Sequence, residues 1–167
     1  MPWIIFDEED RRIPAPRFCL EAAGGEPVCV DDYCEDCSLV LVFPRSGDCE
    51  DCLKLLHAFA ERVRDYAAVD GQILALLPWD SGELRTAGLE LELPFPVLAD
   101  AGAQVRRAYA GLMDESLVNE DDSMIFVLDA YCAPYSAYVG SDPEIQNPGL
   151  HDDVLSWLEF IGVQCPE

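Results

Sequence analysis

Two pairs of cysteines with the same spacing are the residues of this sequence best suited to chemistry. Residues 34–37 and 49–52 both read Cys-Glu-Asp-Cys, and two intervening residues allow one helical turn to close a disulfide. A thiolate can attack a disulfide sulfur or bind a metal ion. The pairs therefore predict thiol redox chemistry or metal binding. The secondary structure around each pair helps to distinguish these two functions.

Cys49 and Cys52 follow a predicted buried strand and open a predicted long helix. Residues 38–43 form a continuous apolar run that ends at Pro44, the pattern of a strand buried on both faces. From residue 49 to residue 66 apolar positions recur at steps of three and four, with acidic residues in the first turn. Because amides at a helix N-terminus stabilise a thiolate, we interpret Cys49 and Cys52 as a catalytic redox pair. A metal-ligand pair and two inert helix cysteines stay open as alternatives.

The remaining elements place this pair in one α/β domain. A hairpin is expected over residues 18–30 around Gly24 and Gly25. Further strands are expected at residues 72–77, 94–98, 124–128 and 137–139, and helices at residues 81–89, 103–110 and 153–161. This order predicts a thioredoxin-like fold, with a central mixed β-sheet, helices on both faces and an N-terminal β-hairpin. Residues 1–12 are expected to be an extension of a core that spans residues 13–161.

Four segments resemble a known family, the alkyl hydroperoxide reductase and thiol-specific antioxidant (AhpC/TSA) branch of the thioredoxin-like proteins. Residues 14–18, Pro-Ala-Pro-Arg-Phe, resemble the opening motif of the family, and residues 39–52 lie over its strand and Cys-x-x-Cys segment. Residues 95–100, Phe-Pro-Val-Leu-Ala-Asp, resemble the segment before a helix that ends in a tyrosine, here Tyr109. Residues 126–129 resemble its Phe-Val-Ile-Asp strand. The resemblance implies a peroxiredoxin-like thiol–disulfide oxidoreductase.

Departures from the family pattern predict weak or absent peroxidase activity. When Cys52 is laid on the reactive cysteine of the peroxidases, Cys49 takes the place of their threonine. Ser123 stands where the family often has an arginine that polarises peroxide. This register favours Cys52 as the attacking thiol, whereas analogy with thioredoxins favours Cys49, so the order of attack stays open. Acidic residues beside the pair oppose the thiolate formation that the helix end favours.

Neither nearby basic residue is expected to act as a general base. His57 is about 80° round the helix from Cys49 and about 140° from Cys52, so we expect it on the helix surface. Arg45 is a cation close in sequence, and it can either pair with local carboxylates or activate a sulfur.

The other six cysteines have no single predicted use. The four cysteines of the two pairs have a zinc-like spacing, but the strand of about 20 Å between them is too long for one shared ion. Cys34 and Cys37 could form a local disulfide, a metal clip with Cys19 or Cys29, or buried thiols. Cys132 and Cys165 are expected to be isolated thiols rather than resolving partners.

The amino-acid composition excludes some classes of binding partner. The sequence has 10 Lys and Arg against 33 Asp and Glu, a net charge of −23, which argues against nucleic acid and anionic membranes. No apolar run approaches the roughly 20 residues of a membrane span, and the start does not resemble a signal peptide, so a cytoplasmic protein is expected. A thiol or disulfide substrate is the expected partner, with no cofactor, and a homodimer stays open.

An acidic loop suggests what kind of protein partner would bind. Residues 114–122 carry five carboxylates and precede the strand that borders the Cys-x-x-Cys segment in thioredoxin-like folds. Six carboxylates are therefore expected to face one another across a groove: Glu120, Asp121 and Asp122 on one side, and Asp48, Glu50 and Asp51 on the other. Such a groove would favour a basic protein. The alternative function is a non-catalytic binding module whose cysteines hold metal or structural disulfides.

Overall fold

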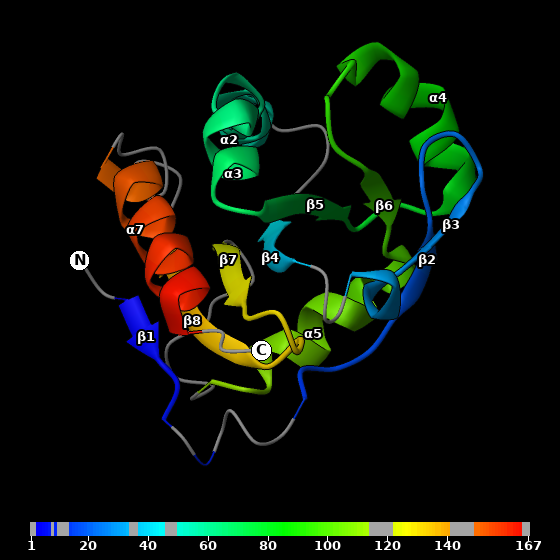
Figure 1. Ribbon diagram of the computed structural model, residues 1–167. Coiled ribbons are helices and arrows are strands. Elements are labelled where there is room, and N and C mark those ends of the chain that lie inside the picture. The colour runs from blue at the N-terminus through cyan, green and yellow to red at the C-terminus, as the bar shows by residue number, and fades with distance from the viewer. Residues whose placement is uncertain are drawn as a thin grey trace.

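Six strands form one mixed sheet in the order β1-β8-β7-β4-β5-β6 (Figure 1). The computed structural model describes residues 3–7, 9, 14–33, 37–45, 50–113, 122–140 and 149–164. The strands are β1 (Trp3–Ile5), β4 (Ser38–Phe43), β5 (Gly71–Leu77), β6 (Val97–Ala99), β7 (Ser123–Leu128) and β8 (Pro134–Gly140). Strand β4 pairs in parallel with β5 and antiparallel with β7. Parallel and antiparallel pairs thus meet at β4, which is the central mixed sheet that the sequence predicts.

Both faces of the sheet are buried, which explains the unbroken apolar run of β4. Val40 and Val42 point into one core cluster and Leu39, Leu41 and Phe43 into the other. The first cluster is covered by four helices, α2 (Glu50–Glu61), α3 (Val63–Ala68), α4 (Ser81–Leu91) and α7 (Gly149–Gln164). The second is covered by α5 (Gln104–Ala110) and the hairpin of β2 (Cys19–Glu21) and β3 (Pro27–Cys29) (Figure 1). Short 3-10 turns, η1 (Val30–Asp32) and η2 (Ala101–Ala103), follow β3 and β6.

The predicted hairpin is present and joins the main body of the fold. Its turn contains Gly25 at a φ of 91°, a left-handed backbone angle that glycine adopts without steric cost. A bridge between Ala22 and Leu98 places the hairpin beside β6.

The predicted helix over residues 49–66 is two helices in the structure. Helix α2 ends at Glu61, and α3 begins after Arg62, whose backbone leaves the helical region at φ −108° and ψ 10°. The Arg62 guanidinium donates to Asp65 at 2.9 Å and to Asp152 of α7 at 3.4 Å. The break at Arg62 redirects the chain, and in α3 Tyr66 lies 2.9 Å from the buried His151 ring, measured from Oη to Nδ1.

Helix α4 is capped by Asp80, whereas the Ser81 at the start of the predicted helix is the residue that the sequence favours as the cap. The Asp80 carboxylate accepts from the Glu83 amide at 2.8 Å, and the Glu83 carboxylate accepts from the Asp80 amide at 3.2 Å. This reciprocal pair satisfies two amides at the helix start, so Ser81 becomes the first helical residue.

The first residues of the chain include a strand that the sequence analysis does not predict. Trp3 pairs with Tyr138 as β1 joins the free edge of β8, and its indole Nε1 donates to Asp153 of α7 at 3.1 Å. Because three residues are too few to show a periodic pattern, the sequence predicts only an N-terminal extension over residues 1–12. Helix α7 is also longer at both ends than the predicted residues 153–161.

Candidate functional site

Cys52 lies in the first turn of α2, just beyond the carboxyl end of the central strand β4. It is the third residue of the helix, 1% exposed, and carries a thiol on the same buried face as Leu55, Leu56 and Phe59. The first amides of an α-helix have no partner within the helix, so this position favours negative charge on sulfur. Cys49, its predicted catalytic partner, and Asp48 lie outside the described residues.

Arg106 brings a cation to this site from the opposite face of the sheet. From α5, its Nη1 donates to the carbonyl of Phe43, the last residue of β4, at 3.1 Å. Its Nη2 donates to the carbonyl of Asp122, immediately before β7. Burial lowers the pKa of Arg106, while the negative charges of Asp122, Cys52 and Asp100 oppose this shift. The sequence analysis does not predict this residue at the site.

Asp100 fixes the start of the helix that carries Arg106. Its carboxylate, in a residue only 2% exposed, accepts from the amides of Val105 at 2.9 Å and Arg106 at 3.0 Å. The Asp100 amide donates to the Leu77 carbonyl at the end of β5, at 2.8 Å. The family-like segment of residues 95–100 therefore anchors α5 beside the site, and this motif is the sequence signal that points toward Arg106.

Tyr109 ties the opening motif to the same helix. Its hydroxyl donates to the Pro16 carbonyl at 2.8 Å, and its ring packs against Phe18, Phe43 and Phe126. Three segments of the family resemblance, at residues 14–18, 39–52 and 126–129, thus meet around one buried tyrosine.

Ser123 contributes a hydrogen bond at the position where the family often has an arginine. Its hydroxyl, fully buried, accepts from the Arg45 amide at 3.1 Å, which links β7 to the segment that follows β4. His57 is exposed on α2, as the helix geometry predicts. The role of the Arg45 guanidinium stays a prediction.

Three of the six carboxylates predicted to face one another across a groove belong to described residues, and the groove itself stays a prediction. Glu50 is largely exposed and lies 3.7 Å from Lys54, while Asp51 is half-buried. Asp122 is beside Arg106, as its carbonyl contact shows. Glu120 and Asp121 lie outside the described residues.

Cys19 and Cys29 form a disulfide across the hairpin, where they are register partners of β2 and β3. Cys37 is a half-buried thiol whose Sγ lies 3.7 Å from the Tyr33 carbonyl. The local disulfide considered for Cys34 and Cys37 is therefore absent, and Cys19 and Cys29 do not act as metal ligands. Cys19 and Cys29 form a disulfide because their strands pair, and the sequence spacing of cysteines cannot show which strands pair.

Cys132 is a disulfide sulfur and not the isolated thiol predicted from the sequence. The turn after β7 places it there: the Asp129 carboxylate accepts from the amides of Tyr131 and Ala133, and Cys132 has a φ of 61°. Its Sγ lies 3.7 Å from the Val30 carbonyl, so it packs beneath the hairpin. No other described cysteine is its disulfide partner, because Cys19 and Cys29 bond each other and Cys37 and Cys52 are thiols. Cys34 and Cys165 lie outside the described residues.

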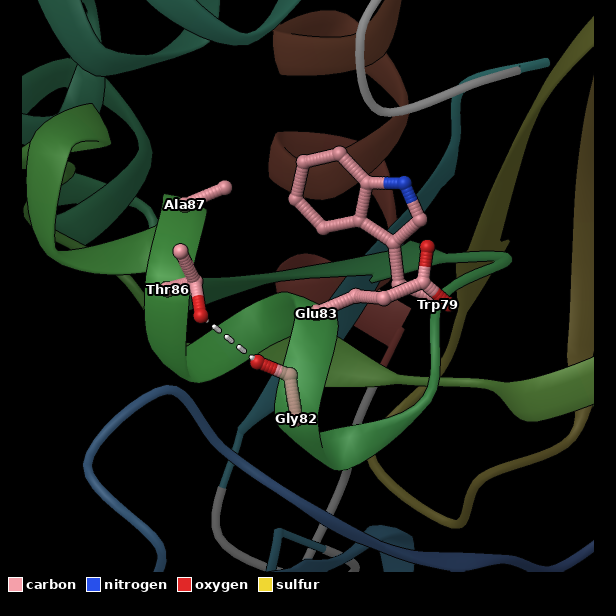
Figure 2. Close-up of a pocket in the computed structure, with 5 residues that line it drawn as sticks. All are labelled: Trp79, Gly82, Glu83, Thr86 and Ala87. Carbon is pink, nitrogen blue, oxygen red and sulfur yellow. Dashed lines mark hydrogen bonds between the residues drawn. The ribbon is translucent and has the colours of Figure 1, made fainter.

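A shallow depression of about 480 Å³ lies along the start of α4 (Figure 2). Trp79, Glu83 and Thr86 line it, and the Thr86 hydroxyl donates to the Gly82 carbonyl at 3.1 Å. The Glu83 carboxylate is used in the helix cap, and the lining includes no cysteine, so the depression is not the thiol site.

Two features of other classes of protein are absent from the described part of the chain. It contains no group of three or more His, Cys, Asp or Glu side chains arranged to hold a metal ion. In the same residues, no helix combines the length and apolar character that crossing a membrane requires.

Solved structures resemble this chain closely in fold and distantly in sequence. The peroxidoxin BcpB of Mycobacterium tuberculosis is 16% identical with a TM-score of 0.71, over 89% of this chain and 96% of that one. A Chlorobium tepidum protein assigned as a thiol:disulfide interchange protein DsbE is 22% identical with a TM-score of 0.67, over 87% and 95%. The Xanthomonas campestris bacterioferritin comigratory protein is 13% identical with a TM-score of 0.70, over 87% and 92%. These likenesses confirm the thioredoxin-like fold.

Sequence comparison agrees with the resemblance of the four segments. No curated protein matches the chain. The AhpC/TSA family, however, matches residues 12–135, from the opening Pro-Ala-Pro motif to the hairpin of β7 and β8. Because this match covers most of the chain and includes Cys52, Asp100 and Arg106, the protein belongs to the AhpC/TSA family.

Proposed function

We propose that this protein is a thiol–disulfide oxidoreductase that uses Cys49 and Cys52. The observation that carries the proposal is the position of the Cys52 thiol, in the first turn of α2 at the carboxyl end of β4. There the unpaired amides at the start of α2 favour negative charge on sulfur, and Arg106 is held beside the end of β4 by the Phe43 and Asp122 carbonyls.

The proposed reaction is exchange between the pair and a disulfide substrate. One thiolate of the pair attacks a substrate sulfur, forms a mixed disulfide and releases one substrate thiolate. The second cysteine, after losing its proton, attacks the mixed disulfide and releases the other. The pair loses two electrons and two protons overall, and the substrate gains both as two thiols.

Peroxide is a poor substrate in this proposal. Cys52 is 1% exposed, and Ser123 does not supply the arginine that the family pattern often has at its position. Arg106 is a cation from another element, but two of its donors are used by the Phe43 and Asp122 carbonyls. Rapid peroxide consumption with a thioredoxin or glutaredoxin donor, lost in Cys52→Ser, would contradict this part of the proposal.

The disulfides elsewhere support a structural role for other cysteines and leave the proposed pair available. Cys19, Cys29 and Cys132 are disulfide sulfurs around the hairpin, whereas Cys52 carries a thiol. The alternative function, a module whose cysteines hold structural disulfides, therefore fits the cysteines around the hairpin. The position of Cys52 at the start of α2 favours catalysis there.

Two further properties stay proposals. An acidic surface with Glu50 and Asp51 beside the site favours a basic protein substrate over an acidic one. The second property is a cytoplasmic location. The Cys19–Cys29 disulfide weighs against this location, because structural disulfides persist mainly in oxidising compartments. Alkylation of thiols before cell lysis, followed by peptide mapping, would show whether this disulfide exists where the protein works.

Mass tagging of alkylated thiols tests the proposed function. Mild oxidation of the wild type should remove two taggable thiols, and a thiol reductant should restore both. Cys37→Ser is the matched control, because it removes a thiol at the other end of β4 and should leave the cycle intact. If Cys49→Ser gives the same reversible oxidised species as the wild type, the pair is not the redox centre.

A further inference from the structure

A tryptophan and a carboxylate line the depression at the start of α4 (Figure 2). Trp79 is half-buried, and the side chains of Glu83 and Thr86 are exposed. The other described residues of the lining, Gly82 and Ala87, are small, and none of the five is basic. The volume of about 480 Å³ is within the range of ligand pockets. The depression therefore offers an aromatic ring and a carboxylate to a ligand.

The start of α4 carries net negative charge. Asp80 and Glu83 each accept a hydrogen bond from the backbone amide of the other, and neither carboxylate forms an ion pair with a described residue. The helix end contributes about half a positive charge, which leaves about 1.5 negative charges. Arg85 of α4 lies 3.8 Å from Glu21 of the hairpin, measured from Nη2 to Oε1, and does not line the depression. A cation would be attracted here and an anion repelled.

The depression lies at the same edge of the sheet as the proposed redox site. Strands β4 and β5 are parallel, so their carboxyl ends share this edge. The Trp79 amide donates to the carbonyl of Leu77, the last residue of β5, at 2.8 Å, and the Asp100 amide donates to the same carbonyl at 2.8 Å. Asp100 in turn holds the amide of Arg106, which donates to the carbonyl of Phe43 at 3.1 Å. A series of hydrogen bonds thus connects the turn before α4 to the end of β4.

We propose that the depression binds a lysine or arginine side chain of the protein whose disulfide is exchanged. The aliphatic stem of that side chain packs on the Trp79 ring, and its charged group meets the Glu83 carboxylate. The identity of the occupant as a substrate rests on the proposed function, whereas binding of a basic side chain at Trp79 rests on the depression alone.

The same residues explain why other side chains would bind less well. An acidic side chain would be repelled by Asp80 and Glu83, and an apolar one would gain only the contact with the Trp79 ring. At an exposed site a cation on an aromatic ring strengthens binding by about twofold to fivefold. The depression therefore selects among partners and does not by itself hold one tightly.

Binding is tested first with peptides that contain no sulfur, so that the result does not depend on redox chemistry. Two blocked pentapeptides, Gly-Ser-Arg-Ser-Gly and Gly-Ser-Gln-Ser-Gly, are titrated at low salt into ¹⁵N-labelled protein. The indole signal of Trp79 is assigned by its loss in Trp79→Phe. The arginine peptide should shift this signal with an affinity about fivefold above that of the glutamine peptide, while the signals of Trp3 and Trp157 stay unchanged.

Glu83→Gln separates the charge of this residue from its part in the helix cap. The amide oxygen can still accept from the Asp80 amide, so the cap is kept while the charge is lost. The affinity for the arginine peptide should fall about threefold, with no change for the glutamine peptide. Glu61→Gln is the matched control, because it neutralises an exposed carboxylate at the last residue of α2 and should retain the wild-type affinity.

Exchange rates then test whether the occupant is the substrate. With two disulfide peptides that differ only in one Arg or Gln, the ratio of their rates should fall about threefold in Glu83→Gln and stay unchanged in Glu61→Gln. A wild-type ratio in Glu83→Gln would overturn the assignment of the depression to the substrate.

Three binding results would overturn the inference: no shift of the Trp79 signal, equal affinities of the two peptides, or equal shifts of all three tryptophan signals, as general attraction to an acidic surface would produce. The proposed function fails separately, if the wild type exchanges with neither disulfide peptide. In that case the titration still decides whether the depression binds a basic side chain.

Discussion

The two ends of strand β4 carry cysteines in contrasting states. We call the carboxyl end, with Cys52 and Arg106, the thiol end. We call the amino end the disulfide end; it comprises the Cys19–Cys29 hairpin disulfide and the disulfide sulfur of Cys132, and the Cys37 thiol lies just before β4. The register that pairs Leu39 with Leu128 brings the β7–β8 turn, and with it Cys132, to the amino end.

The surroundings of each cysteine explain this contrast. At the thiol end, Cys52 lies at a helix N-terminus, where unpaired backbone amides favour charge on sulfur. At the disulfide end, Cys19 and Cys29 lie on antiparallel strands joined by a short turn, where a bond constrains the unfolded chain. One residue type thus has two roles in this protein, set by its neighbours.

The largest expected effect is the loss of disulfide exchange on removing the Cys52 sulfur. Cys52→Ser should reduce the rate of exchange with a disulfide peptide by at least about a hundredfold, because serine cannot form the disulfide. Cys37→Ser should retain the rate within about twofold. The measurement is peptide thiol release under identical protein concentration. Equal losses in the two variants would remove the functional distinction between the ends.

The disulfide end should contribute stability and little activity. Replacing Cys19 and Cys29 together by Ser removes a bond with a sequence separation of 10 residues, and should lower the free energy of unfolding by about 3 kcal/mol. Urea denaturation followed by circular dichroism measures this loss. Exchange should stay within about twofold of the wild type under conditions where both proteins are folded. A large loss of exchange in the folded variant would show that the hairpin takes part in the chemistry.

The contrast between the ends was only partly predictable from the sequence. The apolar runs of β4, β5 and β7 predict buried strands, and Cys52 follows from its place after β4. The motif at residues 95–100 points to the start of α5, but no local pattern shows the contact of Arg106 with Phe43, a residue 63 positions earlier. Cys132 could not be paired for the same reason: its neighbour Val30 is 102 positions away. Local patterns predict elements, whereas these contacts depend on how the elements assemble.

Acid should destabilise the helical face through His151, independently of either cysteine end. Burial, and then the charge of Arg62, lowers the pKa of His151 to about 4, so the folded protein keeps this ring neutral. An unfolded histidine has a pKa of about 6.5, so the unfolded chain binds the extra proton first as pH falls. Stability should therefore decline by about 2 kcal/mol between pH 7 and pH 5 from this residue.

Denaturation of His151→Gln across that pH range checks the effect. The variant should be less stable at pH 7, since it loses ring packing against Phe59, but its pH dependence should be flatter by about 2 kcal/mol. His57→Gln is the matched control, because this exposed ring should leave the slope unchanged. An unaltered slope in His151→Gln would show that other groups cause the acid sensitivity.

The smallest expected effect concerns the choice of partner at the thiol end. Neutralising Glu50 and Asp51 to Gln and Asn should lower the ratio of exchange rates with basic and acidic disulfide peptides by about twofold to threefold at low salt. The matched control neutralises Glu26 and Glu61, two exposed carboxylates away from Cys52, and should leave the ratio unchanged. Since salt screens charges over about 10 Å at 0.1 M, the difference between the two variants should shrink as salt is added. Equal changes in both variants would mean that the overall charge of −23, and not the acidic residues beside Cys52, sets the preference.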